Sequence, residues 1–281
     1  MNEIITTYEP DNSLKKGYLF IFKEIFNEFK NNRWLMYQLF KRDFCALYKQ
    51  TLIGIFWTFI IPLISIGTFV IFNYAGIFTI SDIPFPYAIY ALLGMAFWQI
   101  FSIGLMAGSN SLVKAGSMLV KINFSKKSLV IASCLQSITS FIIQFILVII
   151  LLFWYKITPS IAILFVPIFI IPIILLTIGF SLILSLLNGI MRDIGNSLSS
   201  IITFLMFLTP IFYKKPTTGI LSTITKYNPL YYLISTSREI ILTGTTTEWI
   251  GFLFSIIISI IIFTLCLIIF HLTETRVTER I

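Results

Sequence analysis

The stretch Phe141–Trp154, FIIQFILVIILLFW, settles the structural class of this chain. It carries no charge, and its apolar residues run on instead of alternating with polar ones as in a strand of a membrane barrel. A helix of about 20 apolar residues crosses the hydrocarbon core of a bilayer, and only helices and closed barrels satisfy their backbone polar groups in lipid. The stretch ends the longer apolar segment Leu129–Trp154, which therefore predicts a transmembrane α-helix.

Similar apolar segments recur along the chain. Hydrophobic residues make up 57% of the sequence and charged residues 11%, whereas soluble proteins carry about 25% charged residues. We expect an all-α polytopic membrane protein in which residues 1–51 form a cytoplasmic N-terminal region and residues 52–281 a single transmembrane domain. The six predicted spans, of which the fifth is short, are Leu52–Asn73, Tyr87–Gly108, Leu129–Trp154, Ile161–Leu187, Leu198–Tyr213 and Trp249–Phe270.

The 20 Lys and Arg residues are divided unevenly between the two sides of the membrane that these spans define. Fifteen lie before the first span, in the loop after the second, or after the fourth and sixth, and five lie on the other side. Positively charged loops remain in the cytoplasm, so both termini are predicted to be cytoplasmic. The net charge of +8 is interpreted as this topology signal, with some attraction to anionic lipid headgroups, and not as a nucleic-acid-binding surface. The polar start of the chain shows no secretory signal peptide.

Two helical repeats of apolar residues precede the first span, with charged and amide side chains between them. Helices of this kind lie in the membrane surface with the apolar face down, so we expect amphipathic interface helices here. The alternative is a soluble helix packed on another domain, which is disfavoured because the sequence shows no other soluble domain. The repeats are Leu19, Phe22, Phe26 and Phe29, followed by Met36, Phe40, Phe44 and Leu47.

Two loops combine polar residues with many apolar ones. Residues 109–128 mix four lysines with Leu112, Met118 and Phe124, which predicts either a protruding helix that docks into a partner's groove or a basic loop on lipid headgroups. Residues 214–248, on the other side, contain Pro and Gly between apolar residues and predict two short helices that dip back toward the bilayer as a re-entrant external segment.

The sequence lacks the usual motifs of catalysis. No GxxxxGK[ST], HExxH, GxSxG or GxGxxG occurs, and the apolar cores of the spans contain no Asp, Glu, Lys or Arg. Ion-coupled carriers usually need such ionisable groups at depth. Three cysteines without metal spacing and the single histidine, His271, predict no metal site, so we expect no cofactor in this chain and an energy source on another subunit. Gly104 and Gly108 form a GxxxG, which predicts close helix packing.

An ordered set of short motifs resembles the membrane subunit of bacterial polysaccharide ABC exporters, the permeases for O-antigen, capsular polysaccharide and teichoic acid. The likeness begins near Lys41 and continues to the C-terminus. It departs from the pattern at Ser125, where many members have a proline after the aromatic residue of the coupling segment. The motifs are Lys41-Arg42-Asp43, Tyr48, Leu52, Gly54, Trp57 and Pro62, then Lys121-Ile122-Asn123-Phe124, Asn188, Arg192-Asp193-Ile194, Thr209-Pro210-Ile211-Phe212-Tyr213 and Tyr227-Asn228-Pro229-Leu230.

The resemblance implies a bacterial inner-membrane transporter subunit that is not itself an enzyme. It implies six spans per subunit, a homodimer with the pathway between the two copies, and a cytoplasmic ABC ATPase dimer that would hold ATP and magnesium. The implied cargo is a lipid-linked polysaccharide, a long glycan on undecaprenyl diphosphate, as in O-antigen export for lipopolysaccharide biosynthesis.

Such a cargo assigns roles to particular residues. The diphosphate needs cations at the cytoplasmic interface, and the candidates are Lys41, Arg42 and Lys49. The alternative is that these cations only fix topology and contact anionic lipid. Sugar rings stack on aromatic rings, and the candidate pathway residues are Phe56, Trp57, Phe59, Phe204, Phe207, Phe212 and Tyr213. The external gate would comprise Pro210, Tyr227, Asn228 and Pro229, with Arg238 and Glu239 as a gate ion pair or a solvated surface pair. Coupling to the ATPase would use Lys114, Lys121, Phe124, Lys126, Arg192 and Asp193.

Other functions fit parts of the same pattern. An ABC exporter of drugs or small lipids would have the same architecture, but the amphipathic N-terminal region favours a large lipid-linked cargo. A membrane enzyme acting on polyprenyl-linked sugars would need interfacial carboxylates, and only Asp43 and Asp193 lie near the cytoplasmic ends of spans. A scaffold without a transport role also agrees with the composition.

Overall fold

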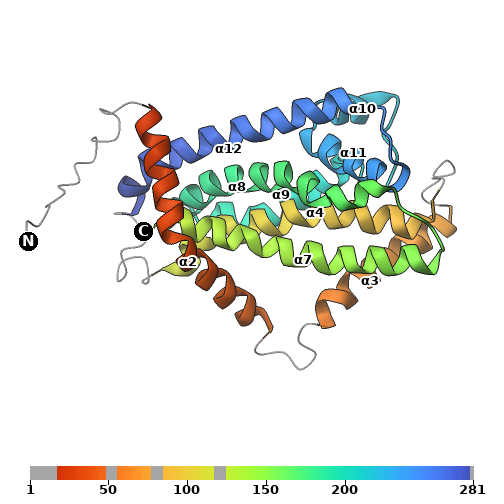
Figure 1. Cartoon of the computed structure of the whole chain (residues 1–281), viewed down its shortest axis with the longest axis horizontal. Helices are drawn as coiled ribbons and strands as arrows, with labels where there is room; N and C mark the ends of the chain where they lie inside the picture. The colour runs from red at the N-terminus through yellow and green to blue at the C-terminus, as the bar shows by residue number, and fades with distance from the viewer. Residues whose placement is uncertain (1–17, 49–55, 77–84, 117–124, 279–281) are drawn as a thin grey trace, which may run out of the picture.

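The computed structural model describes residues 18–48, 56–76, 85–116 and 125–278. The described residues form an elongated bundle of helices (Figure 1). Helix α2 and the C-terminal end of α12 lie at one end of the bundle, here called the α2 end, and α10 and α11 lie at the other, the α11 end. The elements are α2 (Tyr18–Tyr48), α3 (Trp57–Tyr74), α4 (Tyr87–Ser109), α5 (Ser111–Ala115), α7 (Lys126–Trp154), η2 (Ile161–Phe165), α8 (Val166–Ile190), α9 (Asp193–Leu208), α10 (Gly219–Tyr227), α11 (Pro229–Thr243) and α12 (Trp249–Thr278).

Each of the six predicted spans coincides with a helix. Four segments are long and apolar enough to cross a membrane, namely Tyr87–Ser109, Lys126–Trp154, Ile161–Ile190 and Trp249–Thr273. The other two predicted spans fall on α3, with 18 residues, and α9, with 16 residues. At 1.5 Å per residue α9 is about 24 Å long, which is shorter than the roughly 30 Å hydrocarbon core. The polytopic all-α class is confirmed, and the crossing of the bilayer by α3 and α9 stays a prediction.

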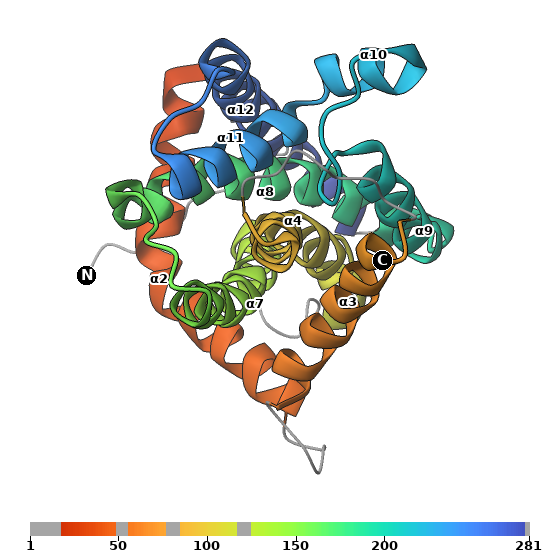
Figure 2. The same ribbon diagram turned by 90° about the vertical axis from the view of Figure 1, so that its right-hand side faces the viewer.

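Helix α4 lies at the centre of the bundle, with α3, α7, α8 and α9 around it (Figure 2). Its side chains at Ile89, Leu92 and Phe97 are fully buried. The predicted close packing at the GxxxG is present, because Gly104 and Gly108 face α7 and α8. A Cβ atom on Gly104 would lie 2.7 Å from Cγ2 of Thr177, and one on Gly108 would overlap the sulfur of Cys134.

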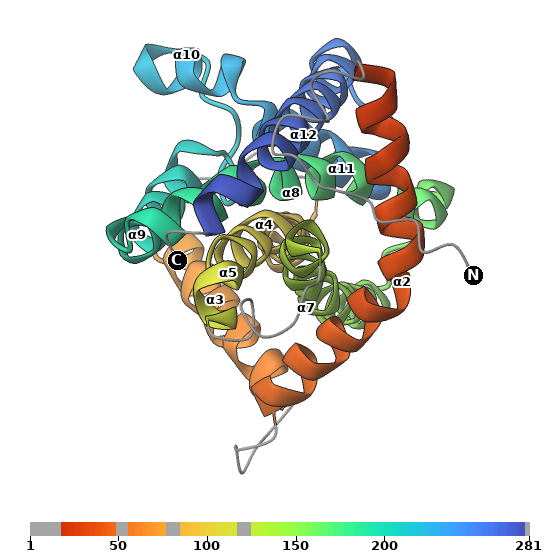
Figure 3. The same cartoon turned by 90° about the vertical axis from the view of Figure 1, so that its left-hand side faces the viewer.

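In the described part of the N-terminal region, residues 18–48, the chain forms one continuous helix, α2, and not the two helices that the apolar repeats predicted. Figures 1 and 3 show α2 bent around two sides of the bundle at the α2 end. Leu39 is buried, and Leu35 and Met36 pack with it against a core formed largely by α7, α8 and α12, so much of the apolar face is covered by this chain itself. Trp34 and Tyr37 point outward and are exposed, as aromatic residues at a membrane surface would be.

The apolar loop at the other end forms two short helices, as predicted. Helix α11 begins at Pro229, where the side chain of Asn228 accepts a hydrogen bond from the amide of Leu230, and ends at Gly244, which has a φ of 81°. It packs against α4, α8 and α12, and most of its residues are buried. Whether the pair of helices re-enters the bilayer stays a prediction.

Candidate functional site

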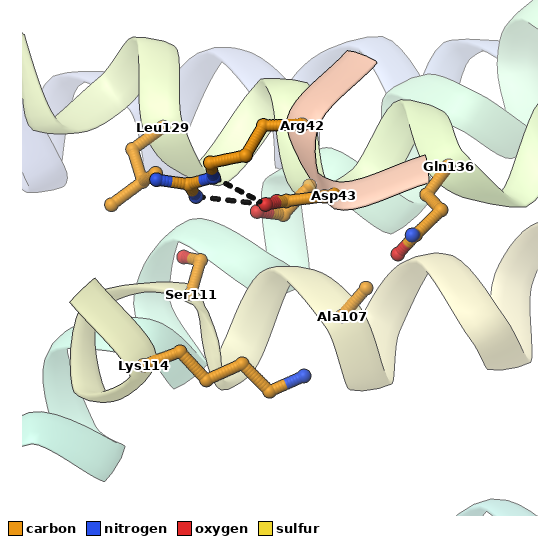
Figure 4. Close-up of a pocket in the computed structure, with 8 residues that line it drawn as sticks. Arg42, Asp43, Ala107, Ser111, Lys114, Leu129 and Gln136 are labelled. Carbon is orange, nitrogen blue, oxygen red and sulfur yellow. Dashed lines mark hydrogen bonds and ion pairs between the residues drawn. The ribbon is translucent and has the colours of Figure 1, made fainter. Parts of the chain in front are cut away.

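A cavity of about 250 Å³ lies at the α2 end, between α2, α4, α5 and α7 (Figure 4). It is slightly smaller than pockets for whole small-molecule ligands, which measure about 300–1,000 Å³. Its wall carries two cations, a carboxylate, two hydroxyls and an amide, so it suits a compact polar group. The lining residues are Arg42, Asp43, Ala107, Ser111, Lys114, Leu129, Ser133 and Gln136.

Arg42 is the predicted headgroup-binding residue that reaches this cavity. Its Nε and Nη2 atoms each lie 2.8 Å from Oδ1 of Asp43, and its side chain is 47% exposed. An exposed ion pair is worth only about 0–1 kcal/mol, so Asp43 orients the guanidinium without withdrawing it from an anion. Lys41 is exposed on α2 but does not line the cavity. Lys49 lies outside the described residues.

Lys114 brings the predicted coupling segment to the same cavity. Helix α5 follows α4 after the single residue Asn110 and stops at Gly116, which has a φ of 43°. Figure 4 shows Ser111 and Lys114 on one side of the cavity and Arg42 on the other. Two cations on opposite walls attract a doubly charged anion placed between them more strongly than either cation alone.

The other predicted coupling residues that the structure describes lie away from the cavity. Lys126 begins α7, and Arg192 and Asp193 are exposed where α9 begins. Lys121 and Phe124 belong to the segment 117–124, outside the described residues. Among the described coupling residues, only Lys114 lines the cavity.

Asn188 joins three helices near the α2 end. Its Nδ2 atom donates to the carbonyl of Ser109 at 3.1 Å and to Oδ1 of Asn110 at 3.0 Å, and its Oδ1 accepts from the amide of Gly195 at 2.9 Å. The end of α8 is thereby bonded to the end of α4 and to the first turn of α9. Asn188 carries part of the family resemblance but was not predicted as a site residue.

A charged cluster that was not predicted from the sequence attaches α2 to the bundle. The Nζ atom of Lys127 is fully buried and lies 2.7 Å from Oε2 of Glu28 on α2 and 2.8 Å from Nδ1 of His271 on α12. Oε2 of Glu24 lies 3.8 Å from Nε2 of His271. Among the described residues, no group of three His, Cys, Asp or Glu side chains could hold a metal ion.

The position of Arg238 contradicts the predicted pair with Glu239. Arg238 is neither part of an ion pair with Glu239 nor solvated, because its side chain is 1% exposed and points from α11 toward α4. Its Nη1 atom donates to the carbonyl of Ile211 at 2.7 Å and its Nη2 atom to the hydroxyl of Tyr90 at 2.5 Å, and its guanidinium lies 3.5 Å from the centre of the Tyr90 ring. Glu239 accepts instead from the hydroxyl of Thr246 at 2.7 Å. Neighbouring helix positions point about 100° apart, which separates the two side chains.

Arg238 is part of a set of contacts that hold the turn after α9. Tyr90 donates to the carbonyl of Tyr213 at 3.4 Å, and Tyr87, one turn earlier on α4, donates to the carbonyl of Phe212 at 3.1 Å. Asn228 donates to the hydroxyl of Thr209 at 2.9 Å. The predicted gate residues Pro210, Asn228 and Pro229 therefore lie in or beside this turn, whereas Tyr227 is 76% exposed. Two of the residues that hold the turn, Tyr87 and Tyr90, were missed, although their spacing of three places both on one face of a helix.

The predicted pathway aromatics fall into three groups by exposure. Four are exposed, as pathway residues would be in an isolated chain: Phe56, Trp57, Phe204 and Phe207. Phe59 is half-buried against the core, and Tyr213 is half-buried with its hydroxyl on the carbonyl of Phe207. Phe212 is 3% exposed inside the main core, so its assignment to the pathway surface is wrong in this conformation.

Comparison with known proteins gives one family. The model of the family described as ABC-2 type transporter matches residues 35–242. The O-antigen export system permease protein RfbA of Klebsiella pneumoniae is 25% identical over 224 residues, which are 78% of this chain and 85% of that protein. A second RfbA of Klebsiella pneumoniae is 26% identical over 224 residues, which are likewise 78% of this chain and 85% of that protein. RfbA of Myxococcus xanthus is 24% identical over 189 residues, which are 66% of this chain and 70% of that protein.

Proposed function

Because the chain belongs to the ABC-2 type transporter family, we propose that it is the transmembrane subunit of an ATP-driven exporter for a lipid-linked polysaccharide in a bacterial cytoplasmic membrane. The relatives named as O-antigen export permeases support both the transport class and a glycan cargo. They favour a permease subunit over a membrane enzyme. The proposed anchor of the glycan is undecaprenyl diphosphate.

The energy for export would come from a separate ABC ATPase dimer below the α2 end, where ATP and magnesium would bind. No phosphate-binding loop is present in this sequence to replace it. Two copies of the chain would face each other through α3 and α9. The exposed aromatic residues Trp57 on α3 and Phe204 and Phe207 on α9 support a glycan-stacking surface between the two copies.

The observation that carries the cargo proposal is the cavity between Arg42 and Lys114. A diphosphate has several negative charges in a compact group, and the cavity presents cations from two walls together with hydroxyl and amide groups. Arg42 lies on the helix before the first span, and Lys114 lies at the start of the predicted coupling segment. A headgroup bound between them would therefore connect cargo arrival to the surface that the ATPase is expected to contact.

The turn after α9 would form the gate at the α11 end. Helix α9 is short, and the turn that follows it is held to α4 by Tyr87, Tyr90 and Arg238. Movement of this turn away from α4 would extend the opening between the α9 helices of the two copies. The excess of Lys and Arg in the loops at the α2 end supports a cytoplasmic position for that end and an external position for this gate.

Export in cells that lack the chromosomal copy of the gene tests the proposal. Arg42→Ala should reduce the lipid-linked glycan at the cell surface severely, while Lys41→Ala, on the same helix but outside the cavity, should reduce it little. Membrane fractionation of both variants checks that they insert equally. Normal surface glycan in the Arg42→Ala cells would refute the headgroup site, and normal surface glycan in cells without the gene would refute the function.

A further inference from the structure

We propose that a second groove, between α10, α11 and α12, binds an anionic phospholipid from the leaflet at the α11 end. The groove has a volume of about 590 Å³. Figure 2 shows α11 beside α12, with α10 projecting farther out, at the end of the bundle that faces the viewer. The lining residues are Lys215, Lys226, Tyr227, Pro229, Tyr232, Glu248, Ile250, Gly251, Phe254, Ser255 and Ile258.

The groove is polar at one end and apolar at the other. Its charged residues are Lys215 from the segment before α10, Lys226 from α10 and Glu248 from the segment before α12. Its apolar floor is one face of α12 from Ile250 to Ile258. Ile258 lies eight positions after Ile250, which is a rise of about 12 Å along the helix, so the groove runs from the beginning of this span toward the middle of the membrane. Gly251 permits the ring of Tyr232 to lie on α12, because a Cβ atom there would overlap the ring. A lipid, which has a charged headgroup followed by an apolar chain, matches this order of polar and apolar residues along the groove.

The charges of the groove match a single phosphodiester. Nζ of Lys215 lies 2.6 Å from Oε1 of Glu248, so these two charges compensate each other. Lys226 is exposed, forms no ion pair with any described residue, and leaves the groove with one positive charge in excess. A phospholipid phosphate with one negative charge is neutralised by that excess, whereas a diphosphate would not be. The groove thus differs in charge from the cavity at Arg42 and Lys114.

The bilayer itself gives access to this groove. Phe254 is 62% exposed, and Leu253, Ile257 and Ile261 continue the exposed apolar surface of α12. In a membrane this surface contacts lipid chains, so a lipid reaches the groove without leaving the bilayer. The proposed dimer faces of α3 and α9 do not include α12, and Figure 2 shows α3 and α12 on opposite sides of α4. Lipid binding in this groove requires only that the chain spans the membrane, and it does not depend on the identity of the exported cargo.

Native mass spectrometry of the full-length chain with bound lipids tests this site. Phosphatidylglycerol and phosphatidylcholine of the same chain length are offered together, and the ratio of the two lipid adducts is measured. Lys226→Gln should lower the preference for phosphatidylglycerol about fivefold, because one lysine near an anionic lipid is worth about 1 kcal/mol. Lys156→Gln is the matched control, since Lys156 is also exposed at the α11 end but outside the groove. Phe254→Ala should weaken retention of both lipids and keep their ratio.

Three results would overturn the proposal. The first is an unchanged lipid ratio in Lys226→Gln, and the second is an equal loss in Lys156→Gln. The third is displacement of phosphatidylglycerol by equimolar undecaprenyl diphosphate, which would assign the groove to a diphosphate anchor. None of these readouts measures export, so failure here leaves the proposed function untouched, and failure of the export test leaves this site untouched.

Discussion

Replacing Tyr90 by Phe tests whether the contacts around Arg238 hold the turn after α9. The change keeps the ring on which the guanidinium lies but removes the hydroxyl, which accepts from Nη2 of Arg238 at 2.5 Å and donates to the carbonyl of Tyr213 at 3.4 Å. A hydrogen bond to a charged group contributes about 1.5–3 kcal/mol. The second bond is long and weak. We therefore expect Tyr90→Phe to lower the free energy of unfolding by about 2–3 kcal/mol.

Tyr87→Phe is the matched comparison. It removes one bond between neutral groups, from the hydroxyl of Tyr87 to the carbonyl of Phe212, which is worth about 1 kcal/mol. The free energies of unfolding of both variants are measured by titrating the purified chain with SDS in mixed micelles and following tryptophan fluorescence. Tyr90→Phe should cost about 1–2 kcal/mol more than Tyr87→Phe, because only Tyr90 leaves a buried charged donor without its acceptor. Equal costs would refute the view that Arg238 depends on Tyr90.

Three further predictions address coupling and helix packing. Charge reversal of both Lys121 and Lys126 should uncouple ATP hydrolysis from export, and unchanged ATPase stimulation together with normal assembly of the complex would argue against their coupling role. Gly108→Ala should destabilise the chain by at least about 1–3 kcal/mol through overpacking against α7 and α8, whereas Gly67→Ala, where a Cβ meets nothing within 4 Å, should be neutral or stabilising; an SDS titration that ranks them the other way would contradict the packing. Asn188→Ala removes three bonds that join α4, α8 and α9 and should lower the melting temperature of the purified chain, and an unchanged melting temperature would show that the ends of these helices are held by other contacts.

The helices of the bundle could be predicted from the sequence because lipid imposes a simple rule on composition. A segment that crosses hydrocarbon must be apolar over about 20 residues, and this property is local. Helices α4, α7 and α12 accordingly begin and end within about three residues of the predicted spans at most of their termini. The N-terminal region was predicted less well. Both of its apolar repeats fall on the single helix α2, because one continuous backbone can carry them both and periodicity does not show whether a helix is interrupted.

The candidate site could be predicted only in part. Arg42 and Lys114 were both assigned to plausible roles, but nothing in the sequence indicated that they line one cavity. Lys127 was counted as a loop cation, although it is buried against Glu28 and His271. Arg238 was paired with its sequence neighbour, whereas its partners Tyr90 and Ile211 lie far from it in the chain. Long-range partners of this kind depend on how the helices pack.

The amino-acid sequence alone determined that this is a membrane protein and where its apolar helices lie, and it predicted the side of the membrane on which its basic loops lie. Each of these properties depends on the free energy of transferring a single segment between water and lipid. That free energy is a sum over neighbouring residues. Only the tertiary structure decided which cations share a cavity, which charged groups are buried, and which groove joins charge to an apolar floor. Those features arise where side chains from three or four helices meet, and in lipid the meeting points are set by close packing at residues such as Gly104 and Gly108 rather than by composition.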